Sequence, residues 1–289
     1  MEKRIGIVIL NYKKYEETLE CVDSILQQTY KNYQIVIVEN GSQNESLDIL
    51  QNRYAKAENI TVLCSEQNVG FARGNNIGIK YAKEKLKCDD IFVINSDIIM
   101  PPGILEQYLL TDTTGTGIIS PTVYSLNQEE IFPSGNTNNM YIKFFRTVFD
   151  ILLTSILQIS FVASLYRKVR PRQDGHTDNS DMSHKAEWKY SVSGCAFVLT
   201  EHFFEYYTQM YPKTFLYWEE MNLLIYLQKA DLVSKVIKTD PLIHKEGRST
   251  REKNEKVDMR KVLRQSRDSM RKSWLMYFMP YKLIKKLYN

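Results

Sequence analysis

Residues 91–97, Ile-Phe-Val-Ile-Asn-Ser-Asp, form an apolar run that stops at a carboxylate. An uninterrupted apolar run of this length is typical of a strand buried on both faces of a parallel sheet. Similar runs occur at residues 5–10, Ile-Gly-Ile-Val-Ile-Leu, and at residues 35–38, Ile-Val-Ile-Val, with helical patterns between them. Strands that alternate with helices predict right-handed crossovers and an α/β fold with a mostly parallel sheet flanked by helices.

Other segments continue this alternation and then become less regular. The apolar spacing predicts further strands at residues 60–64, 118–120, 131–133, 188–199 and 232–237, and helices at residues 15–28, 45–56, 75–86, 144–168, 219–230 and 253–289. Residues 171–187 are polar and include Gly175, which predicts a mobile loop. The chain shows no internal repeat.

Composition restricts the class of protein only loosely. The 289 residues are 43 % hydrophobic and 25 % charged, as in ordinary globular proteins, and the net charge is +4. The four cysteines form no closely spaced pair, so we expect reduced thiols and neither a disulfide scaffold nor a zinc site. The first apolar run is too short for the core of a signal peptide, so we expect an intracellular protein.

Polar residues follow several of the predicted strands. Asn11, Glu39, Asn68 and Asp97 all fall at or just beyond a strand end. Parallel sheets bind ligands outside the carboxyl ends of their strands, so these positions predict a ligand site. Mg²⁺ or Mn²⁺ prefers oxygen ligands and takes one or two carboxylates beside substrate phosphates, which makes Asp97 the candidate metal ligand. A turn or a helix cap is the plainer interpretation of a carboxylate at a strand end.

Two motifs at the right distance from each other favour a particular family. Residues 68–76, Asn-Val-Gly-Phe-Ala-Arg-Gly-Asn-Asn, and residues 95–97, Asn-Ser-Asp, together resemble the nucleotide-sugar site of an inverting family 2 glycosyltransferase. The resemblance implies a GT-A fold with a Rossmann-like sheet, and a donor site formed by Asn11, Tyr12, Glu39, Asn40, Ser42, Asn68, Gly70, Phe71, Gly74, Asn75, Asn95, Ser96, Gly194 and Arg248. In the loop, Gly70 and Gly74 permit a tight turn whose amides can meet a diphosphate.

A second motif lies in the other half of the chain. Residues 215–223, Phe-Leu-Tyr-Trp-Glu-Glu-Met-Asn-Leu, resemble the family segment that supplies the catalytic base. That base maps onto Glu220, with Glu219 beside it, and would take the proton of the acceptor hydroxyl. Acidic residues also favour the first turn of a helix, which is the structural alternative. The family has Asp where this chain has Glu39, Glu220 and Asn222.

A third segment points to one branch of the family. Residues 244–249, His-Lys-Glu-Gly-Arg-Ser, resemble a motif of rhamnosyltransferase-like members. The resemblance implies that His244 completes the metal shell, that Arg248 pairs with phosphate, and that the donor is a dTDP- or UDP-sugar, with dTDP-rhamnose as one candidate.

The resemblance also suggests how the chain is divided. We expect a GT-A domain over residues 1–250 and a basic amphipathic tail over residues 251–289. Within the domain, residues 1–126 form the nucleotide-sugar half, residues 140–187 a helical insertion with its loop, and residues 188–250 the acceptor half.

Two segments suggest contact with a membrane. Within the helix expected at residues 144–168, the apolar run at residues 151–166 is bounded by Asp150 and Arg167 too closely to span a bilayer. The tail mixes Trp274, Tyr277, Phe278, Tyr281 and Leu287 with lysines. We therefore expect a cytoplasmic protein held peripherally at the inner face of the membrane. Core packing or a homodimer interface is the alternative for both segments.

The expected function is metal-dependent transfer of a sugar to a glycan or lipid-linked acceptor in cell-surface polysaccharide synthesis, without a nucleic-acid partner. Two other functions remain open. A nucleotidyltransferase uses a similar sheet and metal, although residues 11–14, Asn-Tyr-Lys-Lys, lack the glycine-rich loop that would hold a triphosphate. A membrane-bound scaffold with a decayed site would explain Glu39, Glu220 and Asn222.

Overall fold

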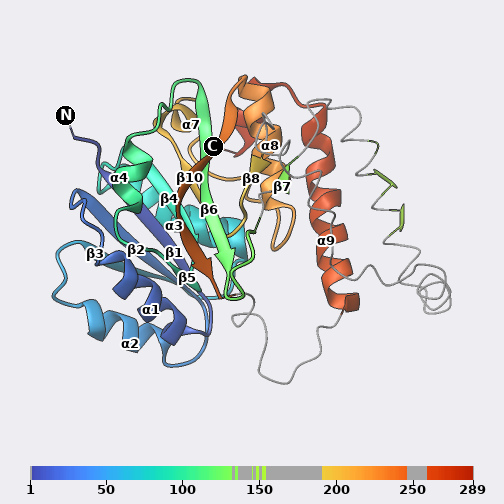
Figure 1. Cartoon of the computed structure of the whole chain (residues 1–289). Helices are drawn as coiled ribbons and strands as arrows, with labels where there is room; N and C mark the ends of the chain where they lie inside the picture. Colours follow the sequence, from blue (N-terminus) through green and yellow to red (C-terminus); the bar gives the residue numbers. More distant parts are fainter. Residues whose placement is uncertain are drawn as a thin grey trace.

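One large sheet forms the centre of the molecule (Figure 1). The computed structural model describes residues 2–131, 134–135, 191–245 and 259–288, together with residues 145, 148, 149, 152 and 153. Within these residues the sheet has eight strands in the order β3-β2-β1-β4-β9-β6-β10-β5. The strands are β1 (Ile5–Asn11), β2 (Tyr33–Asn40), β3 (Ile60–Ser65), β4 (Asp90–Asn95), β5 (Ile98–Ile99), β6 (Thr116–Ser125), β9 (Ala196–Leu199) and β10 (Val233–His244). A separate pair consists of β7 (Ser134–Gly135) and β8 (Ser191–Val192).

The predicted parallel sheet is confirmed for the first four strands. β3, β2, β1 and β4 are parallel neighbours, and β6 and β10 form a second parallel pair. β9 joins the two groups and runs antiparallel to both β4 and β6, while β5 runs antiparallel to β10. The sheet is therefore mixed. It is complete only when β9, from the second half of the chain, lies between β4 and β6, which both come from the first half.

Helices cover both faces of the sheet. One face carries α1 (Tyr15–Ile25), α2 (Ser46–Tyr54) and α4 (Ile104–Leu109). The other face carries α3 (Phe71–Glu84), α7 (Glu201–Tyr206), α8 (Glu219–Ala230), the 3-10 helix η3 (Trp274–Tyr277) and α10 (Tyr281–Tyr288). Alternate residues of β1 enter the two cores, Ile7 on one side and Val8 on the other, as expected for a strand buried on both faces. α9 (Met259–Ser273) precedes η3 and stands at the border of the fold in Figure 1.

Several boundaries differ from the prediction. α3 begins at Phe71 rather than residue 75, because Gly70 adopts a φ of 88° and the Gly74 N–H donates to its carbonyl. The strand expected at residues 188–199 is two short strands, and its first three residues lie outside the described residues. The strand expected at residues 131–133 is absent at Ile131, and the other two residues are not described. α4 and α7 are short helices that the apolar spacing did not predict.

Close packing of α3 on β1 brings the glycine-rich loop to the ends of the strands. A side chain at Gly74 would lie 2.5 Å from Leu10, and one at Gly78 would lie 2.6 Å from Val8. These glycines therefore let the helix approach the sheet closely. The apolar helix expected at residues 144–168 falls almost entirely outside the described residues, and the five described residues there are helical. Among the helices that the structure describes, none has the length and apolar character needed to cross a membrane.

Candidate active site

The carboxyl ends of β1, β2 and β4 lie side by side. In the sheet register Asn11 is opposite Glu39, and Leu10 is opposite Asn95. The predicted strand-end residues are thus neighbours at the carboxyl ends of adjacent strands in the sheet. Asn11 is buried and accepts a 2.8 Å hydrogen bond from the Thr18 hydroxyl, whereas its Nδ2 has no hydrogen-bond partner among the described residues.

Glu39 organises the loop that follows β2. Its carboxylate accepts hydrogen bonds from the Gly41 N–H at 3.1 Å, from the Ser42 N–H at 2.9 Å and from the Ser42 hydroxyl. The Ser42 oxygen in turn accepts the Lys13 N–H at 2.8 Å, which ties this loop to the one after β1. Both oxygens of Glu39 therefore stabilise the protein's own loops. Glu39 is one methylene longer than the Asp expected at this position, and its carboxylate accepts hydrogen bonds from the backbone amides of Gly41 and Ser42.

The loop before α3 is held in the same manner. Asn40 is buried, accepts the Val69 N–H at 3.1 Å and donates to Asn68 Oδ1, also at 3.1 Å. Asn68 Oδ1 accepts the Gly70 N–H at 2.9 Å, and the Phe71 N–H donates to the Phe215 carbonyl at 2.7 Å. The N–H groups of residues 69–71 therefore all have acceptors within the protein, and the expected contact of this loop with a diphosphate stays a prediction.

α3 instead fastens the first half of the chain to the second half. Asn76 donates to the Met210 carbonyl and accepts the Met210 N–H, both at 2.8 Å, and Arg73 donates to the Pro212 carbonyl at 2.7 Å. The neighbouring Asn75 donates to the Phe71 carbonyl at 3.0 Å and keeps its buried Oδ1 without a hydrogen bond. These contacts hold the aromatic segment at residues 215–218, which leads into α8, against the loop at Gly70. The two backbones are so close there that a Cβ added at Gly70 would lie 2.3 Å from the Phe215 carbonyl oxygen.

Asp97 and His244 meet at the end of the sheet although they are distant in sequence. The antiparallel pairing of β5 with β10 aligns Ile98 with His244, and the Lys245 N–H donates to the Asp97 carbonyl at 3.1 Å. His244 Nε2 lies 3.2 Å from Asp97 Oδ1 without the geometry of a hydrogen bond. The Asp97 side chain is 2 % exposed, and among the described residues neither of its oxygens accepts a regular hydrogen bond.

A buried carboxylate without donors requires an explanation, because such a group is costly unless it is paired or binds a cation. One carboxylate and one imidazole, with substrate oxygens completing the shell, suit Mg²⁺ or Mn²⁺. The residues present therefore fit the expected ion, although no group of three or more metal-ligating side chains occurs in the described part of the chain.

Glu220 lies directly against the backbone of Gly194. A Cβ at Gly194 would be 1.9 Å from Glu220 Oε1, so the absence of a side chain there creates the space for this carboxylate. Tyr217 and Trp218, which precede α8, both adopt positive φ angles of 68° and 76°. Two consecutive left-handed residues other than glycine are costly, and such strain is concentrated at functional sites. Burial raises the pKa of Glu220 above its usual range.

Glu219 and Asn222 are buried residues in the same first turn of α8 as Glu220. Glu219 is 7 % exposed, and burial, together with the charge of Glu220, raises its pKa to about 8. Asn222 is 2 % exposed, and neither its oxygen nor its nitrogen has a side-chain hydrogen bond among the described residues. A neutral amide at position 222 avoids placing a further buried negative charge beside two carboxyl groups.

Cys195 connects the two carboxylates and was not predicted as part of the site. It follows Gly194, its carbonyl accepts the Asn95 N–H at 2.8 Å, and its Sγ lies 3.3 Å from the Ser193 hydroxyl. Burial raises the pKa of the Cys195 thiol to about 11, and the charges of Asp97 and Glu220 contribute in the same direction. The backbone at Gly194 and Cys195 therefore links Glu220 on one side to Asn95, two residues before Asp97, on the other, which brings the metal candidate and the base candidate into one site.

The remaining predicted residues fall into two groups. Tyr12, Asn95 and Ser96 lie at the ends of β1 and β4 beside Asn11 and Asp97. Arg248 lies outside the described residues.

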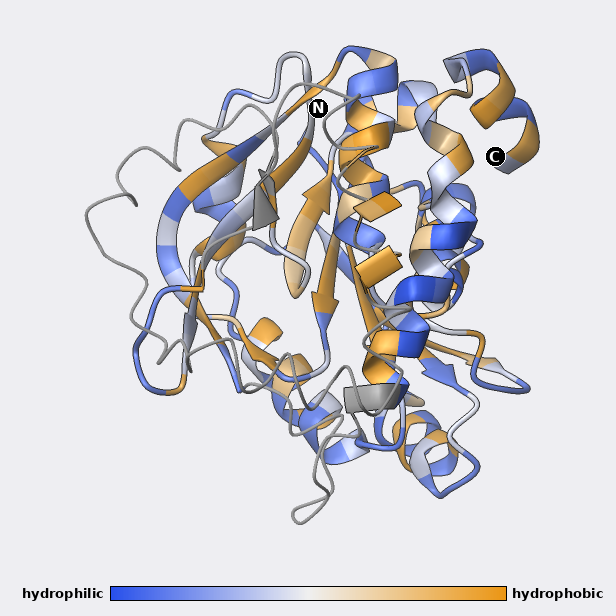
Figure 2. Cartoon of the chain, turned by 90° about the vertical axis from the view of Figure 1, so that its right-hand side faces the viewer, coloured by the Kyte–Doolittle hydropathy of each residue, from blue (hydrophilic) through white to orange (hydrophobic). Residues whose placement is uncertain are grey.

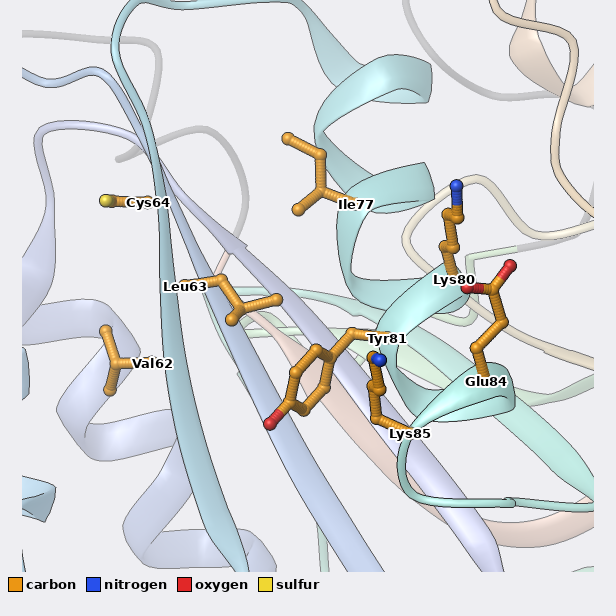
Figure 3. Close-up of a pocket in the computed structure, with 8 residues that line it drawn as sticks. All are labelled: Val62, Leu63, Cys64, Ile77, Lys80, Tyr81, Glu84 and Lys85. Atoms are coloured by element: carbon orange, nitrogen blue, oxygen red, sulfur yellow. The ribbon is translucent and has the colours of Figure 1, made fainter.

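A shallow groove of about 510 Å³ between β3 and α3, lined by Leu63, Ile77 and Tyr81 among others, shares no residue with the candidate site (Figure 3).

Comparison with known proteins agrees with this geometry. The model of the family "Glycosyl transferase family 2" matches residues 6–169, and the fold is of the GT-A type. The chain belongs to glycosyl transferase family 2.

Among its relatives, "Glycosyltransferase GlyG" of Streptococcus pneumoniae is 32 % identical over 106 residues, which cover 37 % of this chain and 34 % of that protein. "Low-salt glycan biosynthesis hexosyltransferase Agl10" of Haloferax volcanii is 30 % identical over 128 residues, which cover 44 % of this chain and 38 % of that protein. The matches thus span little more than a third of the length of these relatives.

Solved structures resemble the fold over more of the chain. The structure of S. aureus TarS residues 1–349 aligns with a TM-score of 0.54 at 11 % identity, covering 84 % of this chain and 60 % of that one. The complex of the same protein with UDP-GlcNAc gives a TM-score of 0.55 at 12 % identity, with 86 % and 61 % covered. At this identity the likeness concerns the fold alone.

Proposed function

We propose that this protein is an inverting glycosyltransferase, which moves a hexose from a nucleoside diphosphate sugar to a hydroxyl group of a glycan or lipid-linked acceptor. One observation carries the proposal: Glu220 lies against the backbone of Gly194, and the carbonyl of the next residue, Cys195, accepts the N–H of Asn95, two residues before Asp97. Separate carboxylates for the diphosphate side and for the acceptor side are what such a transfer needs.

Glu220 acts as the general base. Its carboxylate takes the proton of the acceptor hydroxyl while that oxygen forms a bond to the anomeric carbon, and the bond from that carbon to the diphosphate breaks with its electron pair leaving on the nucleoside diphosphate. Burial raises the pKa of Glu220, which makes its ionised form a stronger base than an exposed glutamate. Gly194 leaves room for this carboxylate, and the left-handed Tyr217 and Trp218 set the direction in which α8 presents it.

Asp97 and His244 are the residues that would hold a divalent cation. When bound, Mg²⁺ or Mn²⁺ supplies positive charge that stabilises the departing diphosphate. Asp97 brings a buried carboxylate whose oxygens are free of regular hydrogen bonds among the described residues, and His244 brings an imidazole within 3.2 Å of it.

The donor is proposed to be a UDP- or dTDP-sugar. Support for UDP comes from structural neighbours, since the TarS structures include complexes with UDP and with UDP-GlcNAc. Support for dTDP-rhamnose comes from the segment at residues 244–249, of which residues 246–249 lie outside the described residues. A relative named for glycan biosynthesis, Agl10, supports a saccharide acceptor. The proposed working place is the inner face of the membrane, where lipid-linked acceptors are found.

Release of nucleoside diphosphate tests the proposal directly. The purified protein is incubated with UDP-, dTDP- and GDP-sugars, with Mg²⁺ or Mn²⁺ and then with EDTA, and donor hydrolysis without an acceptor is measured. Metal-dependent release from one donor is the expected result. Asp97→Asn and Glu220→Gln should each lower turnover by about 100-fold or more, because positioned acid–base and charge-stabilising groups contribute about that much.

Two controls make the outcome specific. Glu84→Gln removes an exposed carboxylate at the end of α3 and should leave turnover unchanged. If no donor is turned over, calorimetric titration distinguishes a strict acceptor requirement, in which a donor still binds, from a decayed site, in which none binds. Turnover unaffected by both Asp97→Asn and Glu220→Gln would refute the assignment of these residues.

A further inference from the structure

The tail at residues 259–288 divides its apolar side chains between two sides. Met276, Tyr277 and Ile284 are buried in the core beside α7 and α8. The Tyr288 ring packs edge-on against Tyr211 at 4.9 Å between centroids, and Lys229 donates to the Tyr277 carbonyl at 2.8 Å. The expectation that Tyr277 meets lipid headgroups is therefore wrong, because this ring anchors the tail to the protein.

A second set of apolar side chains points outward. Its members are between 39 % and 56 % exposed: Trp274, Leu275, Phe278, Leu283 and Leu287. They lie on η3, on the residue after it and on α10, and we call them the tail surface. Core packing explains the inward set but not these five large side chains, which remain partly exposed. In Figure 2 the ribbon near the C-terminus carries both hydrophobic and hydrophilic colours.

Basic residues are the sequence neighbours of the tail surface. Five basic side chains close to it in sequence are exposed: Arg271, Lys272, Lys282, Lys285 and Lys286. Asp268 is the single acidic residue in the described tail, and Arg267 lies 3.8 Å from its carboxylate. The tail surface therefore combines large apolar groups with charge of one sign.

We propose that the tail surface docks on an anionic lipid bilayer. Aromatic and leucine side chains enter the boundary between headgroups and acyl chains, while the lysines keep their ammonium groups at the level of the phosphates. A second copy of this chain is a poorer occupant, because a two-fold contact would place the same basic residues against each other. This docking does not depend on the proposed catalytic function, so a vesicle assay tests it independently of turnover.

Flotation with vesicles tests the docking on the full chain. The protein is expected to float with vesicles of phosphatidylcholine and phosphatidylglycerol and to stay at the bottom with phosphatidylcholine alone. Lys282→Gln and Lys286→Gln should each weaken binding to anionic vesicles about fivefold, since a basic residue near such a surface contributes ~1 kcal/mol. The pair Leu275→Ser and Phe278→Ser should weaken it about tenfold or more.

Matched substitutions elsewhere on the surface serve as controls. Leu110→Ser changes a leucine that is 88 % exposed at the end of α4, and Lys56→Gln changes an exposed lysine after α2. Both should bind anionic vesicles as the wild type does, and thermal unfolding of every variant checks that the tail remains folded. Equal binding to neutral and anionic vesicles, or tail variants that bind like the controls, would overturn the proposal. It would also be overturned if the wild type ignored vesicles and formed dimers that Phe278→Ser dissolved.

Discussion

Replacing Gly194 by alanine tests the placement of the catalytic base most sharply. The new Cβ would lie 1.9 Å from Glu220 Oε1 and 2.9 Å from its Cδ. An ordinary contact needs about 3.4 Å, so the carboxylate has to move by roughly 1.5 Å, about the length of one C–C bond. The three nearest atoms to the new methyl group all belong to Glu220, so the change acts on this side chain before any other.

A displacement of this size is large for catalysis and small for folding. A misplacement of ~1 Å can cost about 100-fold in rate, so kcat for nucleoside diphosphate release in the presence of acceptor should fall about 100-fold in Gly194→Ala. The KM for the donor should stay within about twofold, because the diphosphate side of the site at Asp97 is not touched. Steady-state kinetics with the donor found active in the panel provide both values.

A second substitution should restore part of the loss. Glu220→Asp shortens the side chain by one methylene, ~1.5 Å, which is the distance that the new methyl group demands. The double variant Gly194→Ala with Glu220→Asp should therefore be faster than Gly194→Ala alone. Gly115→Ala is the control, because a Cβ there meets nothing within 4 Å and only its φ of 64° is strained, so it should lower Tm without lowering kcat. A kcat within twofold of wild type in Gly194→Ala would refute the assigned position of Glu220.

Two further predictions concern pH and stability. Burial raises the pKa of Glu219 from 4.5 to about 8, so the folded protein keeps a proton that the unfolded chain releases, and stability should decline as pH rises from about 4.5 to 8. Glu219→Gln should flatten this decline, which Tm measurements across that range can check; an unchanged slope would show that another group causes it. Asn76→Ala removes both hydrogen bonds to the Met210 backbone and leaves two buried groups unsatisfied, so it should lower the free energy of unfolding by about 2–4 kcal/mol in urea titrations. A loss below about 1 kcal/mol would contradict the clamping role of Asn76.

The strands of the sheet and the site at their carboxyl ends could be predicted because the sequence patterns that indicate them are local. Uninterrupted apolar runs fixed the positions of β1, β2 and β4, and the rule that ligands bind at carboxyl ends directed attention to Asn11, Glu39 and Asp97. α8 begins and ends at the predicted residues because an acidic first turn and a continuous apolar stripe mark it. The approach of His244 to Asp97, by contrast, follows from the pairing of β10 with β5, two strands that are far apart in the sequence.

Other features depend on contacts that no local pattern encodes. The glycine-rich loop resembled a phosphate cradle, yet its amides bind Asn40, Asn68 and Phe215, the last of which is distant in sequence. β9 is shorter than its apolar run because a bend at Gly194 and Cys195 separates it from β8. Cys195 carried no sequence signal, since its contact with Asn95 depends on the pairing of β9 with β4, which are far apart in the chain.

The insertion of β9 between β4 and β6 also has a consequence for how the chain is made. Ile94 pairs with Ala196, 102 positions later (196 − 94), so a nascent chain shows one edge of β4 without its final neighbour until that segment leaves the ribosome. At ~5–20 residues per second this interval lasts roughly 5–20 s. The apolar segment of β4 that pairs with β9, residues 91–94, can pair with other chains when it is exposed for that long. The N-terminal half is thus the part of the nascent polypeptide that a chaperone would need to shield, and slower translation between these strands would lengthen its exposure.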